Sequence, residues 1–472
     1  MFDRRFIYKL LALILVVGAI PAIAQIPDFT PPTPLFRAVM QNDVLEVRRL
    51  LEAGADPNEE TFQGFHAVFF AVMHQNLEML RLMVEKGADI DALDRSGSTT
   101  LMWAAFNEQG KTEIVSALLE LGVDPNIKNK VGETALTWAI RRGPTAVVEL
   151  LKKSGASDAP MIKASVENAV RLLQKSGSQF VEASHCSSCH NQSLPQMLVG
   201  VARERGFAVD EEISRQQVAA VVRMWEPVRE AMQQGTERIP DPTISVSYAL
   251  LGLAAEGYKP DALTQSMAHL ISTQQRADGS FRALPVRPPL ESSDFTATAL
   301  SLRSLKFYGS EDPERSIARA LEWLRLAKPY GNEDRVMQLL GMTWGKASSN
   351  DLRSAAAALL KEQQPDGGWA QLPGLEADAY ATGQALVALA WSGQLRVSDA
   401  AYQRGIVFLL RTQRADGSWQ VRTRTYPLQP YKESGFPYGK DQWISAAGTS
   451  WASMALALTA PRLNASIEGA NQ

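Results

Sequence analysis

The sequence is poor in cysteine and histidine, and it has no excess of basic residues. Only two cysteines and five histidines occur among 472 residues, which excludes a framework of several disulfides. Lys plus Arg (48) nearly balance Asp plus Glu (51), for a formal net charge of -3. A chain without a basic excess has little to hold a polyanion, so we expect no nucleic-acid partner. Its length predicts two or more domains.

Long apolar runs are also scarce, and the one at residues 10–17 is too short for a comfortable membrane span. Three basic residues precede or enter it: Arg4, Arg5 and Lys9. Ala22 and Ala24 follow, with the two-residue spacing of small side chains that signal peptidase accepts. We expect residues 1–24 to be a signal peptide that is cleaved after Ala24. The alternative is an uncleaved anchor, and either interpretation predicts a periplasmic or secreted protein.

A short signature recurs between residues 33 and 157. Its first copy is Gly54-Ala55-Asp56-Pro57-Asn58, and later copies begin at Gly87, Gly122 and, in shortened form, Ser154. Each copy follows a helix-like segment with leucines on one face, such as Leu50 and Leu51. Glycine ends such a helix because it enters the left-handed conformation without steric cost. The period of about 33 residues indicates stacked helical repeats.

These copies resemble ankyrin repeats, because Thr33-Pro34-Leu35-Phe36 is similar to the start of that consensus. The family's histidine is replaced by aromatic residues at or near Phe36, Phe69, Trp103 and Trp138. The resemblance implies a solenoid with one continuous core. It also implies a protein partner that binds the turn tips and the concave helical face. The alternative is a spacer or packing platform for the domain that follows.

The two cysteines stand together in the segment His185-Cys186-Ser187-Ser188-Cys189-His190. Cys-x-x-Cys-His is the attachment signature of c-type haem. Both thiols can then bond the vinyl groups of one porphyrin edge, and His190 becomes the axial iron ligand. We therefore expect a covalent haem c held by Cys186, Cys189 and His190. The alternatives are a local disulfide or redox pair, and a metal site, for which only His185 lies close by.

The sequence leaves the sixth iron ligand open. His66 and His74 belong to the ankyrin array, and His185 adjoins the motif too closely to reach the opposite haem face. The remaining candidates are each more typical of ordinary core or surface residues; they are His269, Met197, Met224 and Met232. An open sixth position is equally compatible with the sequence, and would favour small-ligand binding.

A second repeat lies in residues 240–462, downstream of a helical segment at residues 160–239 that contains the cysteines. Its three copies run from Gln274 to Phe281, from Gln363 to Trp369 and from Gln413 to Trp419. Each has an Asp-Gly turn between one helix-like segment and an alanine-rich second one. The copies resemble the glutamine-tryptophan repeats of squalene and hopene cyclases and of prenyltransferase beta subunits. This resemblance implies an α/α toroid in which the glutamine and the aromatic residue tie the turn to adjoining helices.

The chemistry of those families is not carried over, because their catalytic residues are missing. The cyclases' Asp-x-Asp-Asp motif does not occur, and its nearest counterpart, Asp294, is typical of a helix N-cap. A zinc thiolate or a thioester in the toroid would need a cysteine, and residues 240–462 have none. Aromatic residues of the last copy are typical of core but are also suited to line a cavity; they are Tyr426, Tyr431, Phe436, Tyr438, Trp443 and Trp451.

The sequence thus predicts an all-α protein, an ankyrin solenoid followed by an α/α toroid. We interpret it as an exported haem c protein for electron transfer or redox sensing, with a protein partner on the ankyrin repeats and a possible redox partner. One alternative is a cyclase-like toroid enzyme that acts on or binds a lipid or glycan. Another is a non-catalytic interaction scaffold with a disulfide. Whether the chain is an enzyme stays open.

Overall fold

The computed structural model describes residues 33–60, 65–106, 111–235, 239–284, 286–309, 313–426 and 432–463. The predicted signal peptide, residues 1–24, lies outside them. The described residues form helices and only three isolated β-bridges, which confirms the all-α prediction. Within these ranges, no helix has the length and apolar character that a bilayer span needs. By internal packing the chain divides into two units, residues 1–95 and 96–472.

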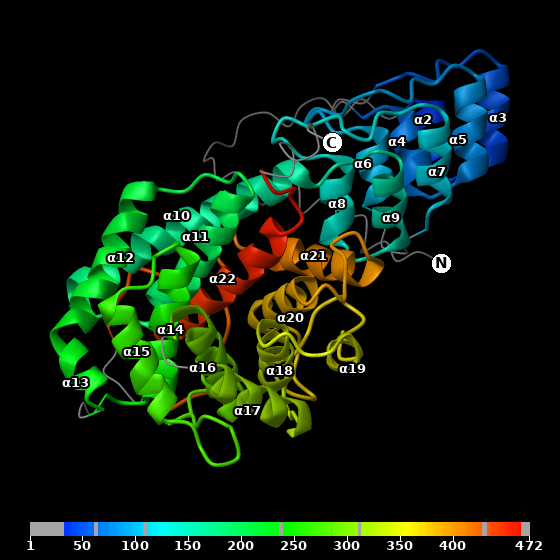
Figure 1. The fold of residues 1–472 in the computed structure, drawn as a ribbon. Helices are drawn as coiled ribbons and strands as arrows, with labels where there is room; N and C mark the ends of the chain where they lie inside the picture. Colours follow the sequence, from blue (N-terminus) through cyan, green and yellow to red (C-terminus); the bar gives the residue numbers. More distant parts are fainter. Residues whose placement is uncertain are drawn as a thin grey trace, which may run out of the picture. The chain divides into compact units, whose positions relative to one another are not determined.

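The first unit contains two helical hairpins (Figure 1). Their helices are α2 (Pro34–Met40), α3 (Val44–Glu52), α4 (Ala67–Met73) and α5 (Leu77–Glu85). Gly54 and Gly87 follow the second helix of each hairpin with φ of +90° and +92°. A Cβ at either position would meet no atom within 4 Å. Glycine is therefore required by its backbone conformation and not by lack of space.

The asparagine of the recurring signature ties consecutive repeats together. Asn58 donates its side-chain amide to the Gly87 carbonyl and accepts from the Asp89 backbone N–H, at 2.9 and 2.7 Å. In the second unit, Asn126 does the same with the Gly155 carbonyl and the Ser157 N–H, at 3.1 and 3.3 Å. The asparagine side chain of the signature thus bonds the backbone of the next loop, and these bonds link consecutive loops.

The second unit begins with two further hairpins, made by α6 (Thr100–Ala105), α7 (Glu113–Glu120), α8 (Ala135–Arg141) and α9 (Ala146–Lys153). Here the aromatic residues that replace the family histidine pack on each other, with the Trp103 and Trp138 ring centroids 5.3 Å apart. The last hairpin also packs on the toroid, because α8 contacts α21 (Ala400–Thr412). Lys152 of α9 donates to Gln403 of α21 at 2.6 Å. This contact makes the last repeat part of the same compact unit.

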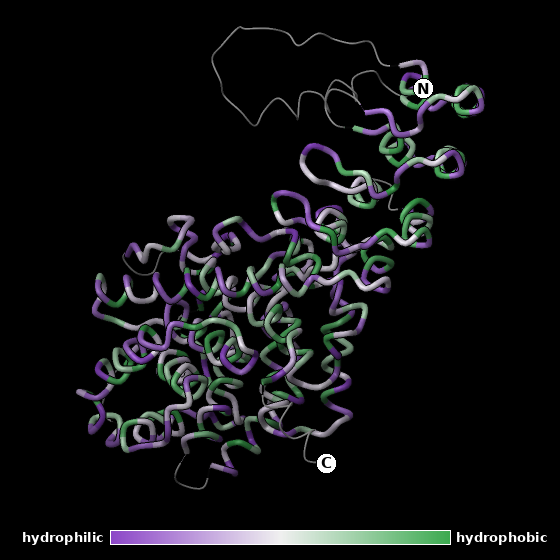
Figure 2. Tube along the Cα trace, turned by 90° about the horizontal axis from the view of Figure 1, so that it is seen from above, coloured by the Kyte–Doolittle hydropathy of each residue, from purple (hydrophilic) through white to green (hydrophobic). Residues whose placement is uncertain are grey.

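The toroid is a closed ring of six inner helices surrounded by outer ones (Figure 1). The inner helices, each in contact with the next and the last with the first, are α11 (Leu194–Glu204), α14 (Pro242–Ala255), α16 (Asp294–Tyr308), α18 (Asn332–Trp344), α20 (Ala379–Trp391) and α22 (Gln442–Ala457). The other helices are α10 (Ala159–Ser184), α12 (Glu211–Trp225), α13 (Arg229–Gln233), α15 (Ala262–Thr273), α17 (Pro313–Leu326), α19 (Ser349–Leu360) and α21. Hydrophobic and hydrophilic residues alternate along the helical coils of the chain (Figure 2).

The three glutamine-containing turns fix each outer helix to the next one, as the resemblance implied. Gln363 donates to the Gly367 carbonyl within its own turn and to the Ala401 carbonyl of α21, at 2.9 and 2.8 Å. Gln413 makes the equivalent bonds to Gly417 and to Ser165 of α10, and so closes the ring. The aromatic residue of the turn is buried beneath it, and the indole N–H groups of Trp369 and Trp419 donate to carbonyls at the ends of the preceding outer helices.

Small residues allow neighbouring inner helices to approach closely. A Cβ on Gly383 of α20 would come within 2.4 Å of the Ala452 backbone nitrogen in α22. Such a distance is far inside van der Waals contact, so only glycine fits there. The alanine-rich composition of these segments is thus explained by packing.

Candidate functional site

The N-terminal ends of four inner helices carry carboxyl groups that are buried or partly buried. Asp241 precedes α14, Glu291 precedes α16, Glu333 lies in the first turn of α18 and Asp378 caps α20. Burial raises the pKa of Asp241 and of Asp378 to about 6. Carboxyl groups gathered and desolvated at one end of a ring are typical of a functional site.

The segment with the two cysteines leads into the same end of the ring. Helix α10 ends at His185, which has a φ of +52°. Residues Cys189–Ser193 then form a single π-helical turn that continues directly into inner helix α11. Gln192 anchors this turn, accepting from the Ser188 N–H at 2.7 Å and donating to the Gly177 carbonyl at 2.9 Å. Turns of this kind are rare and frequently occur at functional sites.

Cys186 and Cys189 are both free, and their surroundings differ. Cys186 is exposed, whereas the partly buried Cys189 thiol donates to a Glu291 carboxylate oxygen at 3.0 Å. Burial, followed by the negative charge of Glu291, holds the pKa of Cys189 well above its ordinary value. Glu291 is itself 3% exposed and forms an ion pair with Arg287. The structure therefore brings a buried carboxylate to the second cysteine, a neighbour that the sequence did not reveal.

The His190 imidazole lies between two aromatic rings, with centroids 6.2 Å from Phe180 and 5.7 Å from Trp443. Its Nδ1 is 3.5 Å from the Cys189 sulfur. Burial, followed by the positive charge of Arg287, lowers the pKa of His190 to about 3. The ring is consequently neutral at physiological pH, the form in which histidine binds metals.

The donor set suits a c-type haem. Two unbonded thiols three residues apart and a neutral imidazole directly after them are the groups that this attachment needs. Attachment at Cys189 would replace its S–H by a thioether and leave Glu291 to its ion pair with Arg287. Within the described ranges, the cysteine motif included, no three His, Cys, Asp or Glu side chains gather as a metal site.

Among the candidates for a sixth ligand, the structure brings one beside the motif. The Met224 sulfur accepts from the Ser187 hydroxyl at 2.9 Å and from its N–H at 3.3 Å. Met197 and Met232 are buried in the toroid core, 3% and 0% exposed. His269 lies in α15, and His66 and His74 belong to the first unit.

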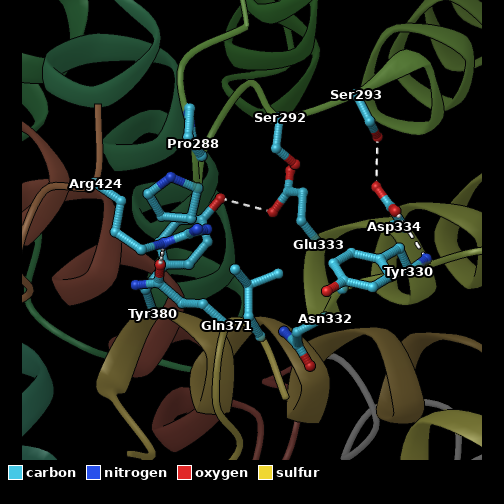
Figure 3. Close-up of a pocket in the computed structure, with 13 residues that line it drawn as sticks. Pro288, Ser292, Ser293, Tyr330, Asn332, Glu333, Asp334, Gln371, Tyr380 and Arg424 are labelled. Atoms are coloured by element: carbon cyan, nitrogen blue, oxygen red, sulfur yellow. Dashed lines mark hydrogen bonds between the residues drawn. The ribbon is translucent and has the colours of Figure 1, made fainter. Parts of the chain in front are cut away.

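A pocket of about 160 Å³ opens at the starts of α16, α18 and α20 (Figure 3). Its lining residues are Pro288, Pro289, Ser292, Ser293, Tyr330, Gly331, Asn332, Glu333, Asp334, Gln371, Leu372, Tyr380 and Arg424. Glu333 is 5% exposed and its oxygens accept from three donors; these are Thr296 at 2.9 Å, Tyr380 at 2.9 Å and Gln384 at 2.6 Å. Burial outweighs these bonds and raises the pKa of Glu333 to about 8. At neutral pH the pocket therefore contains a carboxylic acid rather than a carboxylate.

Asp294 is neither a desolvated acid nor the helix cap. Ser293 caps α16 through a bond to the Phe295 N–H, and Asp294 is the first helical residue. Its carboxylate pairs with Arg276 at 2.9 Å and accepts from the Ala283 N–H. The desolvated acid at these helix starts is Glu333, which the sequence analysis did not identify. The single signal that pointed to it is a Glu-Asp pair just after Gly331, where the next inner helix begins.

Of the aromatic residues of the last copy that the structure describes, none lines this pocket. Phe436 and Trp451 are core residues, 2% and 1% exposed, whereas Tyr426 is 86% exposed. Trp443 faces His190, Tyr438 packs partly buried against the core, and Tyr431 lies outside the described residues.

Comparisons with known proteins agree with the two repeat systems. The family described as ankyrin repeats matches three overlapping stretches, residues 14–94, 35–129 and 101–183. The squalene-hopene cyclase C-terminal domain matches residues 330–469. The ankyrin and toroid assignments are thereby confirmed. Ankyrin repeats are protein-interaction modules, so a protein-binding role in general terms is supported.

Similarity to curated proteins covers only part of each chain. Palmitoyltransferase AKR1 of Lachancea kluyveri is 29% identical over 180 residues, 37% of this chain and 22% of that protein. ZDHHC13 of Danio rerio is 36% identical over 73 residues, 16% of this chain and 11% of its own. The ankyrin repeat protein FPV222 of fowlpox virus is 36% identical over 55 residues, 12% of this chain and 7% of its own. The chain thus spans less than a quarter of the length of these relatives.

Proposed function

We propose that this chain is an exported haem c protein, used in electron transfer or redox sensing, that docks a protein partner through its ankyrin repeats. Cys186 and Cys189 hold the haem covalently and His190 ligates its iron. When bound, the haem supplies an iron centre that takes up and releases one electron. Export through the signal peptide places the chain where c-type haem is attached, and a redox partner is part of the proposal.

The observation that carries the proposal is the position of the motif. The two free thiols and the imidazole all lie in the short segment that enters the ring between α10 and α11. The Met224 thioether contacts Ser187, one of the two residues between the cysteines. The protein therefore provides the two attachment thiols and the iron ligand within one region.

The test is expression with an export signal and cytochrome-maturation machinery, followed by a pyridine haemochrome spectrum. We expect one haem per chain in the wild type and in Ser187→Ala, a control that leaves the three motif positions intact. Cys186→Ala should retain a single thioether, and Cys186→Ala/Cys189→Ala should lose the covalent haem. His190→Ala should shift the absorption spectrum of the native protein, which is recorded before pyridine is added because pyridine replaces the axial ligands. A colourless wild-type protein that is fully exported and folded contradicts the proposal.

A second candidate function is a toroid that binds or acts on a lipid or glycan. It is favoured by the pocket at the starts of α16, α18 and α20, in which Glu333 is an enclosed acid. A bound ligand stabilises the folded toroid according to its concentration and affinity. We expect a true ligand to raise the thermal midpoint of the wild type and of Ser349→Phe, an exposed serine in α19, but not of Ser292→Phe, which fills the pocket. Equal shifts in both variants would exclude the pocket as the binding site.

A further inference from the structure

Three positively charged side chains converge where the neighbouring inner helices α16 and α18 end. These helices finish at Tyr308 and Trp344, at the opposite end of the ring from the cysteine motif. The Arg303 guanidinium lies over the Trp344 ring, 5.0 Å from its centroid, and the Lys306 ammonium donates to the Trp344 carbonyl. Lys346 follows Trp344 by two positions, and its charge acts on Lys306. Two helices thus bring three cations to one place.

The Arg303 guanidinium has no anionic partner among the described residues. Arg303 is partly buried, and of its three guanidinium nitrogens only Nε is fully covered. The two terminal nitrogens reach solvent and form no hydrogen bond with a described residue. Burial lowers the pKa of Arg303, and the group that opposes this effect is the phenol of Tyr308 rather than a carboxylate. A partly desolvated cation is normally paired, so this one lacks a counter-ion.

The positive charge at this place exceeds what the helix ends neutralise. The C-terminus of a helix carries roughly half a negative charge, so the ends of α16 and α18 together offset about one positive charge. Glu314, in the first turn of α17, acts on Lys306 less strongly than the like charge of Lys346 does. None of the three cations forms an ion pair with a described carboxylate. An excess of roughly one to two positive charges is left.

Lys346 occupies a position that usually holds glycine. It follows Gly345, the C-cap of α18, and its φ is +59°. Helices commonly end with a glycine in this left-handed conformation, because glycine has no Cβ to clash. A lysine is retained here despite the backbone strain, which is typical of functional positions.

A phosphate group has the charge and the acceptors that these side chains lack. It carries about two negative charges near neutral pH and three acceptor oxygens. The planar fork of arginine binds two such oxygens at once, and lysine adds a point charge. The Trp344 ring and the cover over Nε hold the Arg303 fork in place, so less conformational entropy is lost on binding. A monocarboxylate would neutralise only part of the excess charge.

We propose that Arg303, Lys306 and Lys346 form a binding site for a phosphate group, carried by a free phosphate compound or by a lipid headgroup. Arg303 binds two of its oxygens, and the ammonium groups of Lys306 and Lys346 balance its charge. The site lies outside the haem motif and outside the pocket at the starts of α16, α18 and α20. The inference therefore goes beyond both candidate functions and depends on neither.

The test is a titration of the full-length protein with sodium phosphate at constant ionic strength, followed by phosphorus NMR. The wild type should bind phosphate saturably, and Arg303→Gln should weaken binding about tenfold or more, because hydrogen bonds between charged groups are strong. Arg303→Lys, which keeps the charge and loses the fork, should lie between them. Arg353→Gln, a matched change of an exposed arginine in α19, should bind like the wild type.

Lys346→Gln changes an exposed side chain, so its result does not depend on the folding of the core. It should bind phosphate severalfold more weakly than the wild type. Equal phosphate affinity of the wild type, Arg303→Gln and Lys346→Gln would overturn the inference. Sodium acetate bound as tightly as phosphate would overturn the assignment to phosphate.

Sedimentation with phosphatidylcholine vesicles, with and without phosphatidic acid, distinguishes the two sources of phosphate. Vesicle binding that needs phosphatidic acid and is lost in Arg303→Gln assigns a lipid headgroup. Binding of sodium phosphate without vesicle binding assigns a free phosphate compound. Absence of binding to both probes overturns the inference and leaves the haem proposal and the pocket untouched.

Discussion

The pocket acid Glu333 should make the stability of the toroid depend on pH in a direction opposite to that of an ordinary surface carboxylate. Its pKa is about 8 in the folded chain, against an ordinary value of 4.5. Between these values the folded state keeps a proton that the unfolded chain has lost. Since the folded state binds more protons, stability falls as pH rises through this window. At about 1.36 kcal/mol per pH unit, the full difference amounts to roughly 5 kcal/mol.

Glu333→Gln removes this ionisation while preserving the shape of the side chain. The hydroxyls of Thr296 and Tyr380 can reverse their bonds to match the new amide. We therefore expect the variant to unfold at higher urea concentration than the wild type at pH 8 to 9, and with little difference at pH 5. The assay is urea unfolding from pH 5 to 9, followed by the fluorescence of tryptophans buried in the toroid.

Other groups titrate in the same range, so the informative quantity is the difference between the two profiles. Glu120→Gln, a change of an exposed carboxylate in α7, should follow the wild-type profile. Parallel stability–pH profiles for the wild type and Glu333→Gln would refute the reasoning. They would show that folding does not raise the pKa of Glu333.

Three further predictions concern the repeats, each measured by urea unfolding. Gln413→Ala removes the donor of two backbone carbonyls where the ring closes, and should lower the free energy of unfolding by about 1–3 kcal/mol. Gln265→Ala, which changes an exposed glutamine in α15, should lower it far less. Gly87→Ala should lower the free energy of unfolding by about 1–2 kcal/mol because φ is +92°. Gly87→Asn should lower it less, because asparagine tolerates this conformation better. Equal losses would mean that crowding, and not the backbone conformation, is the cause. Asn126→Ala removes both bonds between the last two ankyrin loops and should cost about 1–3 kcal/mol; an unchanged midpoint would show that these bonds contribute nothing.

Sequence repetition made the fold predictable. Each copy of a repeat places the same residue in the same environment, so one physical explanation serves every copy. Gly54 and Gly87 share a left-handed backbone, and Gln363 and Gln413 make the same pair of bonds. A pattern that occurs several times is therefore readable without coordinates.

The candidate site was only partly predictable, because it is not repeated. The cysteine motif is local, so its residues could be read from the sequence. Glu291 lies 102 positions beyond Cys189 and reaches it only when the ring closes. Glu333 is made unusual by burial, which depends on helices distant in sequence. Asp294 is the nearest match in the sequence to the cyclase motif, but in the structure its carboxylate forms an ion pair with Arg276.

The central claim is that the two cysteines carry a haem. Intact-mass spectrometry of the exported, non-reduced protein tests it most directly. The account predicts that the mature chain, cleaved after Ala24, is heavier than its sequence by one haem and absorbs visible light. A mass two hydrogens below that of the sequence, with no visible absorption, would mean a Cys186–Cys189 disulfide and would contradict it.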